Sequence, residues 1–215
     1  MNNKKICFIM CVNNQLKAEE ALNYINRLII PEGYTVECLT VTEQKSMTAG
    51  YNEAMKSSDA KYKVYMHQDV LILNENFIED MLSIFQDKTI GMLGMVGTPK
   101  LPSDAIMWHG PRVGKILTWN HSKTNLIEFG KISGKYQEVE AVDGLLIATQ
   151  YDVMWREDLF DKWDFYDVSS GFEMRRKGYK VVVPSMLEPW CLHDDGVMNL
   201  VNYYVERGKF IKEYL

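Results

Sequence analysis

The stretch VYMHQDVLI, residues 64–72, starts as a buried strand and then becomes polar at His67, Gln68 and Asp69. Alternate residues of a strand face the same side, so His67 and Asp69 share one face and Gln68 takes the other. Imidazole and carboxylate groups are poor core material unless they are paired or bind a ligand. The stretch therefore predicts either a strand that opens onto a site or one that simply ends in a solvated Asp69.

Strand-like and helix-like segments alternate on both sides of this stretch. Short continuous apolar runs predict strands buried on both faces, and apolar residues at helical spacing predict helices between them. Such alternation is typical of a parallel sheet with right-handed crossovers. We therefore expect an α/β protein with a mostly parallel central sheet flanked by helices. The predicted strands are 6–12, 35–42, 62–69, 90–97, 141–149 and 179–184, and the predicted helices are 16–30, 46–57, 74–85, 164–177 and 197–215.

Residues 98–139 interrupt the alternation with a segment rich in Gly, Pro, Ser, Lys and aromatic residues. A loop of this length is unusual in a compact domain unless it is functional or contains elements of its own. The runs KILTWNH (115–121) and NLIEFGK (125–131) could form the arms of a hairpin. We expect a single domain, 1–215, in which 98–139 is an irregular insertion or an acceptor-side loop region.

Composition and charge narrow the class of protein. The chain has 215 residues, a formal charge of -5 and a pI of about 5.5, which argues against nucleic acid as a partner. No pair of the four cysteines has zinc-type spacing, which is typical of reduced thiols in a cytoplasmic protein. No run approaches the ~20 apolar residues of a membrane span. The last segment, NYYVERGKFIKEYL (202–215), could contact a membrane surface or a partner, or pack as an ordinary terminal helix.

Polar residues gather near the ends of several predicted strands, where parallel sheets bind their ligands. Glu43 follows the second strand, Asp143 lies in AVDGLLIAT, and His193 and Asp194 follow the last apolar run. Asp69 with His193 would offer Mn²⁺ or Mg²⁺ an oxygen and a nitrogen ligand, completed by water or phosphate. The chain contains neither of the glycine-rich phosphate loops GxGxxG and GxxxxGK[ST].

Asp167 lies at or near the start of a predicted helix in WDFYDVSSGFEMRRKGYKVVVP, residues 163–184. A carboxylate there stabilises the helix as a cap or through the helix dipole. It could also take a proton from an acceptor hydroxyl as a general base. On local chemistry alone, the cap is the favoured interpretation.

The order and spacing of these motifs resemble the inverting, family 2-like nucleotide-sugar glycosyltransferases of the GT-A fold. The resemblance is greatest to a short bacterial subgroup with His-Gln-Asp in place of Asp-X-Asp. It covers most of the chain, and no single motif decides it. The motifs that carry it are SMTAGYNEAM (46–55), YMHQDVLI (65–72) and FYDVSSGFEMRRKGYKVVVP (165–184).

The resemblance implies roles for the residues at the metal and at the base. Asp69 matches the last Asp of Asp-X-Asp, which contacts the metal and the donor diphosphate, and His67 takes the place of the first Asp. His193 matches the late metal-ligand histidine. Asp167 matches the catalytic base of a Glu-Asp pair, in which Tyr166 replaces the Glu.

The resemblance also implies residues on the donor and acceptor sides. Glu43 stands near the acidic residue that binds uracil or ribose, although TEQKS replaces the usual Asp-Asp-Gly-Ser, and Asn52 matches a helix residue near the nucleotide. Asp143 and Gly144 match the strand that borders the acceptor. The aromatic residues of the insertion are either an acceptor platform or lid, or a local packed core: Trp108, His109, Trp119 and His121.

The implied activity is that of a metal-dependent, inverting hexosyltransferase that uses Mn²⁺ or Mg²⁺. A UDP-sugar is the favoured donor, and the acceptor would be a sugar or a lipid-linked sugar. A non-catalytic nucleotide-sugar or glycan-binding protein is the main alternative, because Tyr166, His67 and TEQKS depart from the pattern. A sugar-nucleotide nucleotidyltransferase is disfavoured, because CVNNQLKAEE lacks a glycine-rich basic loop after the first strand.

Overall fold

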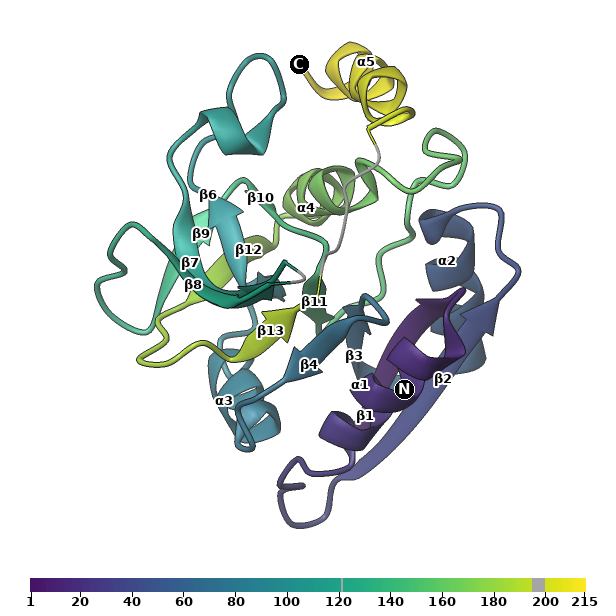
Figure 1. Ribbon diagram of the computed structural model, residues 1–215, viewed down its shortest axis with the longest axis vertical. Coiled ribbons are helices and arrows are strands. Elements are labelled where there is room, and N and C mark those ends of the chain that lie inside the picture. Colours follow the sequence, from purple (N-terminus) through teal and green to yellow (C-terminus); the bar gives the residue numbers. More distant parts are fainter. Residues whose placement is uncertain (121, 195–199) are drawn as a thin grey trace.

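The computed structural model describes residues 1–120, 122–194 and 200–215, which form two β-sheets with flanking helices (Figure 1). The larger sheet has the strand order β2-β1-β3-β11-β5-β12-β9. β11 and β9 run antiparallel to their neighbours, while the other strands point the same way, so the prediction of a mostly parallel sheet is confirmed. Its strands are β1 (Asn2–Val12), β2 (Thr35–Thr42), β3 (Ala60–Met66), β5 (Ile90–Gly94), β9 (Tyr136–Val139), β11 (Leu146–Thr149) and β12 (Lys180–Pro184).

A second sheet, which the sequence did not predict, has the order β10-β6-β7-β13-β4, with β8 paired to β7. Two of the predicted strands divide between the two sheets, since 90–97 becomes β5 and β6 and 141–149 becomes β10 and β11. The predicted strand 62–69 ends earlier, at Met66 in β3, and β4 follows after a turn. Apolar composition alone does not reveal where a buried run turns. The bounds are β4 (Val70–Ile72), β6 (Val96–Thr98), β7 (Val113–Trp119), β8 (Thr124–Phe129), β10 (Ala141–Val142) and β13 (Cys191–His193).

The sequence placed two helix caps correctly, but the first helix ends at Ile25 instead of residue 30 and the third begins at Phe77 instead of residue 74. The Ser46 hydroxyl accepts from the N–H of Ala49 and caps α2, as predicted. Gly178 follows α4 with a φ of 84°, a left-handed conformation that glycine adopts without strain. The helices are α1 (Gln15–Ile25), α2 (Met47–Ser57), α3 (Phe77–Ile84), α4 (Tyr166–Arg176) and α5 (Tyr203–Tyr214), with a short 3₁₀ helix η1 (Met107–His109).

The insertion at 98–139 contains regular structure. β7 and β8 pair antiparallel, with Lys115 opposite Glu128, which confirms the predicted hairpin. The description of the whole chain as one domain with this insertion stays a prediction. His121 and residues 195–199, including the start of the predicted closing helix, lie outside the described residues.

The C-terminal helix α5 packs onto α4 and the segment before it. Phe210 is fully buried and contacts the rings of Phe165 and Phe172 at centroid distances of 5.5 and 5.1 Å. Full burial of such a side chain contributes about 1.5–3 kcal/mol of hydrophobic free energy. Tyr204 and Val205 remain exposed on the helix. Within the described residues, no helix is both long enough and apolar enough to cross a bilayer.

Candidate active site

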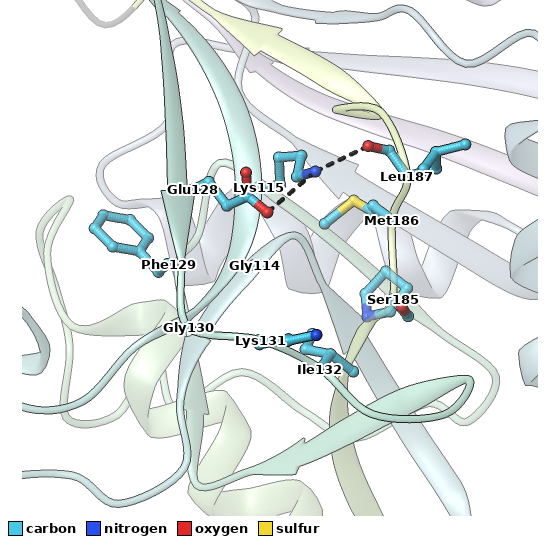
Figure 2. Close-up of a pocket in the computed structure, with 11 residues that line it drawn as sticks. Gly114, Lys115, Glu128, Phe129, Gly130, Lys131, Ile132, Ser185, Met186 and Leu187 are labelled. Atoms are coloured by element: carbon cyan, nitrogen blue, oxygen red, sulfur yellow. Dashed lines mark hydrogen bonds and ion pairs between the residues drawn. The ribbon is translucent and has the colours of Figure 1, made fainter.

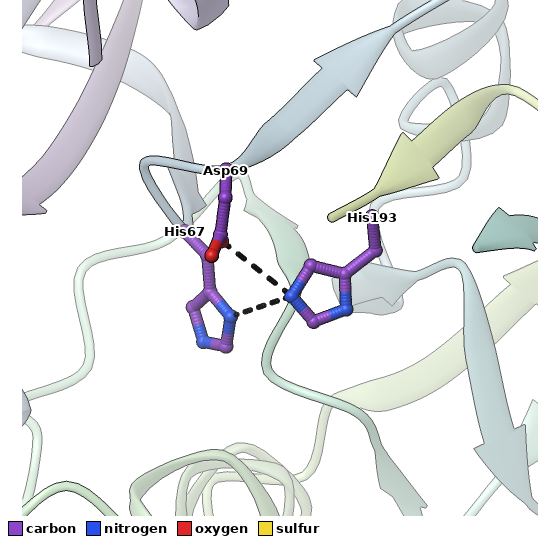
Figure 3. A group of neighbouring side chains, drawn as sticks. All are labelled: His67, Asp69 and His193. Atoms are coloured by element: carbon purple, nitrogen blue, oxygen red, sulfur yellow. Dashed lines mark hydrogen bonds and ion pairs between the residues drawn. The ribbon is translucent and has the colours of Figure 1, made fainter. Parts of the chain in front are cut away.

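His67, Asp69 and His193 meet where the two sheets join. His67 and Asp69 lie on the connection from β3 to β4, and antiparallel pairing of β13 with β4 places His193 opposite Val70. His193 Nε2 lies 3.5 Å from Asp69 Oδ1 and 3.4 Å from His67 Nδ1 (Figure 3). Each residue offers one ligand atom, and these atoms all lie within 4.8 Å of one another. This proximity of Asp69 and His193 was predicted from their places after two apolar strands.

Gln68, between His67 and Asp69, faces the other way. Its Oε1 accepts from the N–H groups of Asn13 and Asn14 at 3.0 and 2.8 Å, and its Nε2 donates to Asn13 Oδ1 at 2.6 Å. These bonds tie the exit of β3 to the exit of β1. The predicted separation of Gln68 from His67 and Asp69 is present, but the turn after Met66 produces it rather than the alternation of a strand.

Asp69 is surrounded by positive or hydrogen-bonding groups. Burial opposes its ionisation, but the hydrogen bond to His193 and nearby positive charge, including Lys17, hold its pKa at about 2. Lys17 Nζ lies 3.4 Å from Asp69 Oδ2 and 3.0 Å from Asp194 Oδ2. Lys17 was not predicted from the sequence, where its only signal is its place in the first turn of the helix after β1. Asp69 is therefore ionised at neutral pH.

His67 is a neutral imidazole. Burial, together with the neighbouring His193, lowers the pKa of His67 to about 4. A metal-bound histidine must likewise be deprotonated. Its second nitrogen, Nε2, lies 2.5 Å from the phenol oxygen of Tyr166 at the start of α4. His67 therefore contacts both the predicted metal ligands and the helix that carries Asp167.

Asp167 lies in a contrasting environment beside the turn between β10 and β11. Its Oδ2 accepts from the N–H of Gly144 and its Oδ1 from the N–H of Val168, both at 2.8 Å. Burial first, and then the charge of Asp143, raise the pKa of Asp167 to about 7 despite these bonds. A carboxylate with a pKa near neutrality is suited to general-base work. The structure thus brings Asp143, Gly144 and Asp167 together.

Of the two residues expected on the nucleotide side, Glu43 is accessible. It ends β2 with a φ of 56°, a strained conformation that is concentrated at functional sites. It also lines a cavity of about 100 Å³ together with Asn13, Gln44 and Trp163. Asn52, by contrast, is 1% exposed. Its amide donates to the carbonyl of Trp155 and accepts from the N–H of Trp155, both at 2.9 Å, so a nucleotide contact would have to replace these bonds.

The two tryptophans of the insertion, Trp108 and Trp119, lie in different parts of it. Trp108 is 42% exposed and packs near Phe129 and Arg112, at 6.2 and 5.3 Å. Trp119 comes directly after Thr118, which is paired with His193 in the neighbouring strand. The strand register therefore places the backbone of Trp119 next to the residue that pairs with His193.

Two larger cavities lie at the other end of the second sheet. One, of about 240 Å³, lies between the hairpin and residues 184–187 (Figure 2). There, Lys115 Nζ lies 3.2 Å from Glu128 Oε1 and donates to the carbonyl of Leu187 at 2.8 Å. The other, of about 550 Å³, is lined in part by Trp190. Neither cavity is lined by His67, Asp69 or His193.

Comparison with known sequences identifies related proteins. The sequence model of a glycosyltransferase-like family matches residues 7–214. The streptomycin biosynthesis protein StrF of Streptomyces griseus is 28% identical in an alignment 172 residues long that covers 73% of this chain and 56% of StrF. The chain thus spans little more than half the length of this curated relative.

Comparison with solved structures finds the same fold in nucleotide-sugar transferases. TarS of S. aureus covers 94% of this chain and 38% of its own, with a TM-score of 0.61 and 11% identity. A TarS fragment was solved with UDP-GlcNAc. The mannosyltransferase PcManGT of Pyrobaculum calidifontis, in complex with GDP-Man and Mn²⁺, covers 97% and 61%, with a TM-score of 0.57 and 12% identity.

A Drosophila β-1,4-galactosyltransferase 7 variant in complex with manganese, UDP-Gal and xylobiose is also similar. It covers 91% of this chain and 71% of its own, with a TM-score of 0.53 and 13% identity. At such identities the likeness concerns the fold. The prediction of a GT-A-like α/β fold is confirmed.

Proposed function

Because the chain belongs to the glycosyltransferase-like family, we propose that it is a metal-dependent hexosyltransferase that moves a sugar from a nucleotide donor to an acceptor hydroxyl with inversion. Family and fold together indicate a glycosyltransferase. The observation that carries the finer proposal is the cluster of His67, Asp69 and His193, whose ligand atoms lie within 4.8 Å of one another. We treat residues 1–215 as one such domain.

The chemistry of these ligands fits a divalent transition metal. Two imidazole nitrogens and one carboxylate oxygen suit Mn²⁺ better than Mg²⁺, which prefers oxygen ligands. The ion, when bound, neutralises charge that develops on the departing nucleoside diphosphate. Mn²⁺ in the PcManGT complex and manganese in the galactosyltransferase complex support this choice.

Asp167 is the proposed base. Its carboxylate would take the proton of the acceptor hydroxyl, and that oxygen would attack the anomeric carbon from the face opposite the leaving diphosphate. The configuration is then inverted in one step without an enzyme nucleophile. Its pKa of about 7 supports this role, because the group is then both ionised at working pH and basic enough to accept a proton.

For the donor and the acceptor, we propose classes of molecule rather than single compounds. The UDP-sugars in the TarS and galactosyltransferase structures favour a UDP-sugar as the donor. GDP-Man in the PcManGT complex makes a GDP-sugar the alternative donor to test. Glu43 and its small cavity are the proposed contact for the base or ribose. The acceptor is a sugar or lipid-linked sugar, with Asp143, Gly144 and the insertion tryptophans at its side. Membrane contact through α5 stays a prediction.

The test measures nucleotide release and sugar transfer from UDP-GlcNAc, UDP-Gal and GDP-Man, with and without Mn²⁺. Product configuration is read by proton NMR. We expect Mn²⁺-dependent turnover with inversion, and its loss in His193→Gln. His109→Gln is the matched control, because His109 forms a separate pair with Asp104 at 2.7 Å. Donor binding without turnover would instead establish the non-catalytic binding protein.

A further inference from the structure

The two residues that depart from the family pattern at the site contact each other. His67 stands in place of the first Asp of Asp-X-Asp, and Tyr166 stands in place of the Glu of the Glu-Asp pair. They are 99 positions apart, yet His67 Nε2 lies 2.5 Å from the Tyr166 hydroxyl. We propose that Tyr166 is a positioning residue that fixes the tautomer and direction of His67, so that Nδ1 of His67 faces Asp69 and His193. This inference rests on the metal site of the proposed function.

The hydroxyl of Tyr166 is held in a fixed place. The residue is 4% exposed, and its ring packs against Tyr51 and Trp155 at centroid distances of 5.9 and 6.0 Å. The preceding residue, Phe165, has a φ of 58°, which is strained for an aromatic side chain. Ring packing and the backbone conformation together restrict the phenol, so its hydroxyl can hold His67 in one orientation.

Gly144 provides the space that the hydroxyl occupies. A Cβ at position 144 would overlap the Tyr166 hydroxyl. The same turn is bonded to His67, whose N–H donates to the carbonyl of Leu145 at 3.0 Å. The turn therefore fixes the backbone of His67 and admits the phenol that holds its ring.

The shared position of the three ligand atoms indicates which tautomer of His67 is needed. His193 Nε2 faces both Asp69 Oδ1, at 3.5 Å, and His67 Nδ1, at 3.4 Å. A metal ion held between these atoms needs a lone pair on His193 Nε2 and on His67 Nδ1. A neutral His67 then carries its proton on Nε2, and that N–H donates to the oxygen of Tyr166.

A phenol and a carboxylate would differ at position 166. A glutamate beside His67 would add a buried negative charge next to Asp69. Tyr166 can orient the ring of His67 without adding charge.

The test compares Tyr166→Phe with the matched control Tyr51→Phe. Both lose a hydroxyl from the same aromatic cluster, but the Tyr51 hydroxyl donates to the carbonyl of Met66, at 3.4 Å. The tautomer of His67 is read from ¹⁵N-imidazole NMR, and Mn²⁺ affinity from electron paramagnetic resonance. We expect the Nε2–H tautomer in the parent, its loss in Tyr166→Phe, and ~10-fold weaker Mn²⁺ binding, as for other partners of metal ligands. Tyr51→Phe should match the parent.

An unchanged His67 tautomer in Tyr166→Phe would overturn the inference, whatever the Mn²⁺ affinity. So would an Nδ1–H tautomer in the parent. A parent that binds no Mn²⁺ would refute the metal site of the proposed function, while the NMR result would still decide whether Tyr166 orients His67. If Tyr166→Phe does not fold, Gly144→Ala displaces the same hydroxyl with the ring retained and should give the same tautomer change.

Discussion

Asp69 and Asp167 are the same kind of side chain in two opposite environments. Asp69 lies beside His193 and Lys17, and its pKa is held at about 2 against the effect of burial. Asp167 is held by two backbone N–H groups beside Asp143, and burial with that neighbouring charge raises its pKa to about 7. Two carboxylates with separated pKa values can take separate roles. We therefore expect Asp69 to stay ionised and hold the metal, and Asp167 to accept a proton.

Tyr166 and Gly144 lie between these two regions. The Tyr166 hydroxyl contacts His67, and the N–H of Gly144 donates to Asp167. Both groups are neutral, so neither adds charge to the surroundings of Asp69 or Asp167. The two carboxylates can therefore be tested separately.

The largest expected effect is on the Asp167 side. Asp167→Asn should lower kcat by ~10²- to 10⁴-fold, because an amide cannot take the acceptor proton. Donor affinity, measured by calorimetry, should change little. Asp164→Asn is the matched control from the same segment, and it should keep the parent's kcat. If kcat of Asp167→Asn stays within a few-fold of the parent, another group is the base.

The next effect is on the Asp69 side. Asp69→Asn should weaken Mn²⁺ binding by more than ~100-fold, since loss of a ligand should exceed the 10- to 100-fold loss typical of outer partners. The rise in melting temperature that Mn²⁺ gives the parent should vanish as well. Asp104→Asn, which alters the Asp104–His109 pair instead, is the control. Retention of tight Mn²⁺ binding by Asp69→Asn would remove Asp69 from the ligand set.

The pH dependence separates the carboxylates without removing either. Asp167 is protonated below its pKa of about 7, so kcat should fall about tenfold for each pH unit below 7. Asp143→Asn removes a negative neighbour and should move the midpoint of this profile to lower pH. Its Oδ1 can still accept from the N–H of Leu145, as in the parent. A profile that is flat from pH 5 to 8 would contradict the assignment.

The shifted pKa values also predict how the free energy of unfolding depends on pH. The folded pKa of Asp167 is above its usual value of 3.8, so the folded state holds this proton more tightly than the unfolded state. Its contribution to the free energy of unfolding is complete below about pH 4 and is lost as the pH rises through about 7. Asp69, with its lowered pKa, contributes stability that is lost only as the pH falls toward about 2.

The smallest expected effect concerns Lys17. Its ammonium lies 3.4 Å from Asp69 Oδ2 and repels a second cation. Lys17→Met should therefore tighten Mn²⁺ binding by a few-fold, as measured by electron paramagnetic resonance in the absence of donor. Lys115→Met, at the distant cavity, should have no effect. Weaker binding in Lys17→Met would mean that the lysine mainly holds Asp69 in position.

The sequence predicted those features that follow from local pattern. The run 35–42 is β2, the Ser46 cap begins α2, and the strand-end argument brought Asp69 close to His193. It did not predict the second sheet, because a continuous apolar run does not show where the chain turns. The contact between His67 and Tyr166 was equally hidden, since it depends on the packing of α4 beside the turn that contains Gly144.

The space at Gly144 has a consequence for how such a site can evolve. A side chain at position 144 and a tyrosine hydroxyl at position 166 exclude each other. Substitutions at the two positions are therefore epistatic, and an ancestor with a larger residue at 144 had to acquire glycine before, or together with, Tyr166. Ancestral reconstruction should find the tyrosine confined to lineages that carry this glycine.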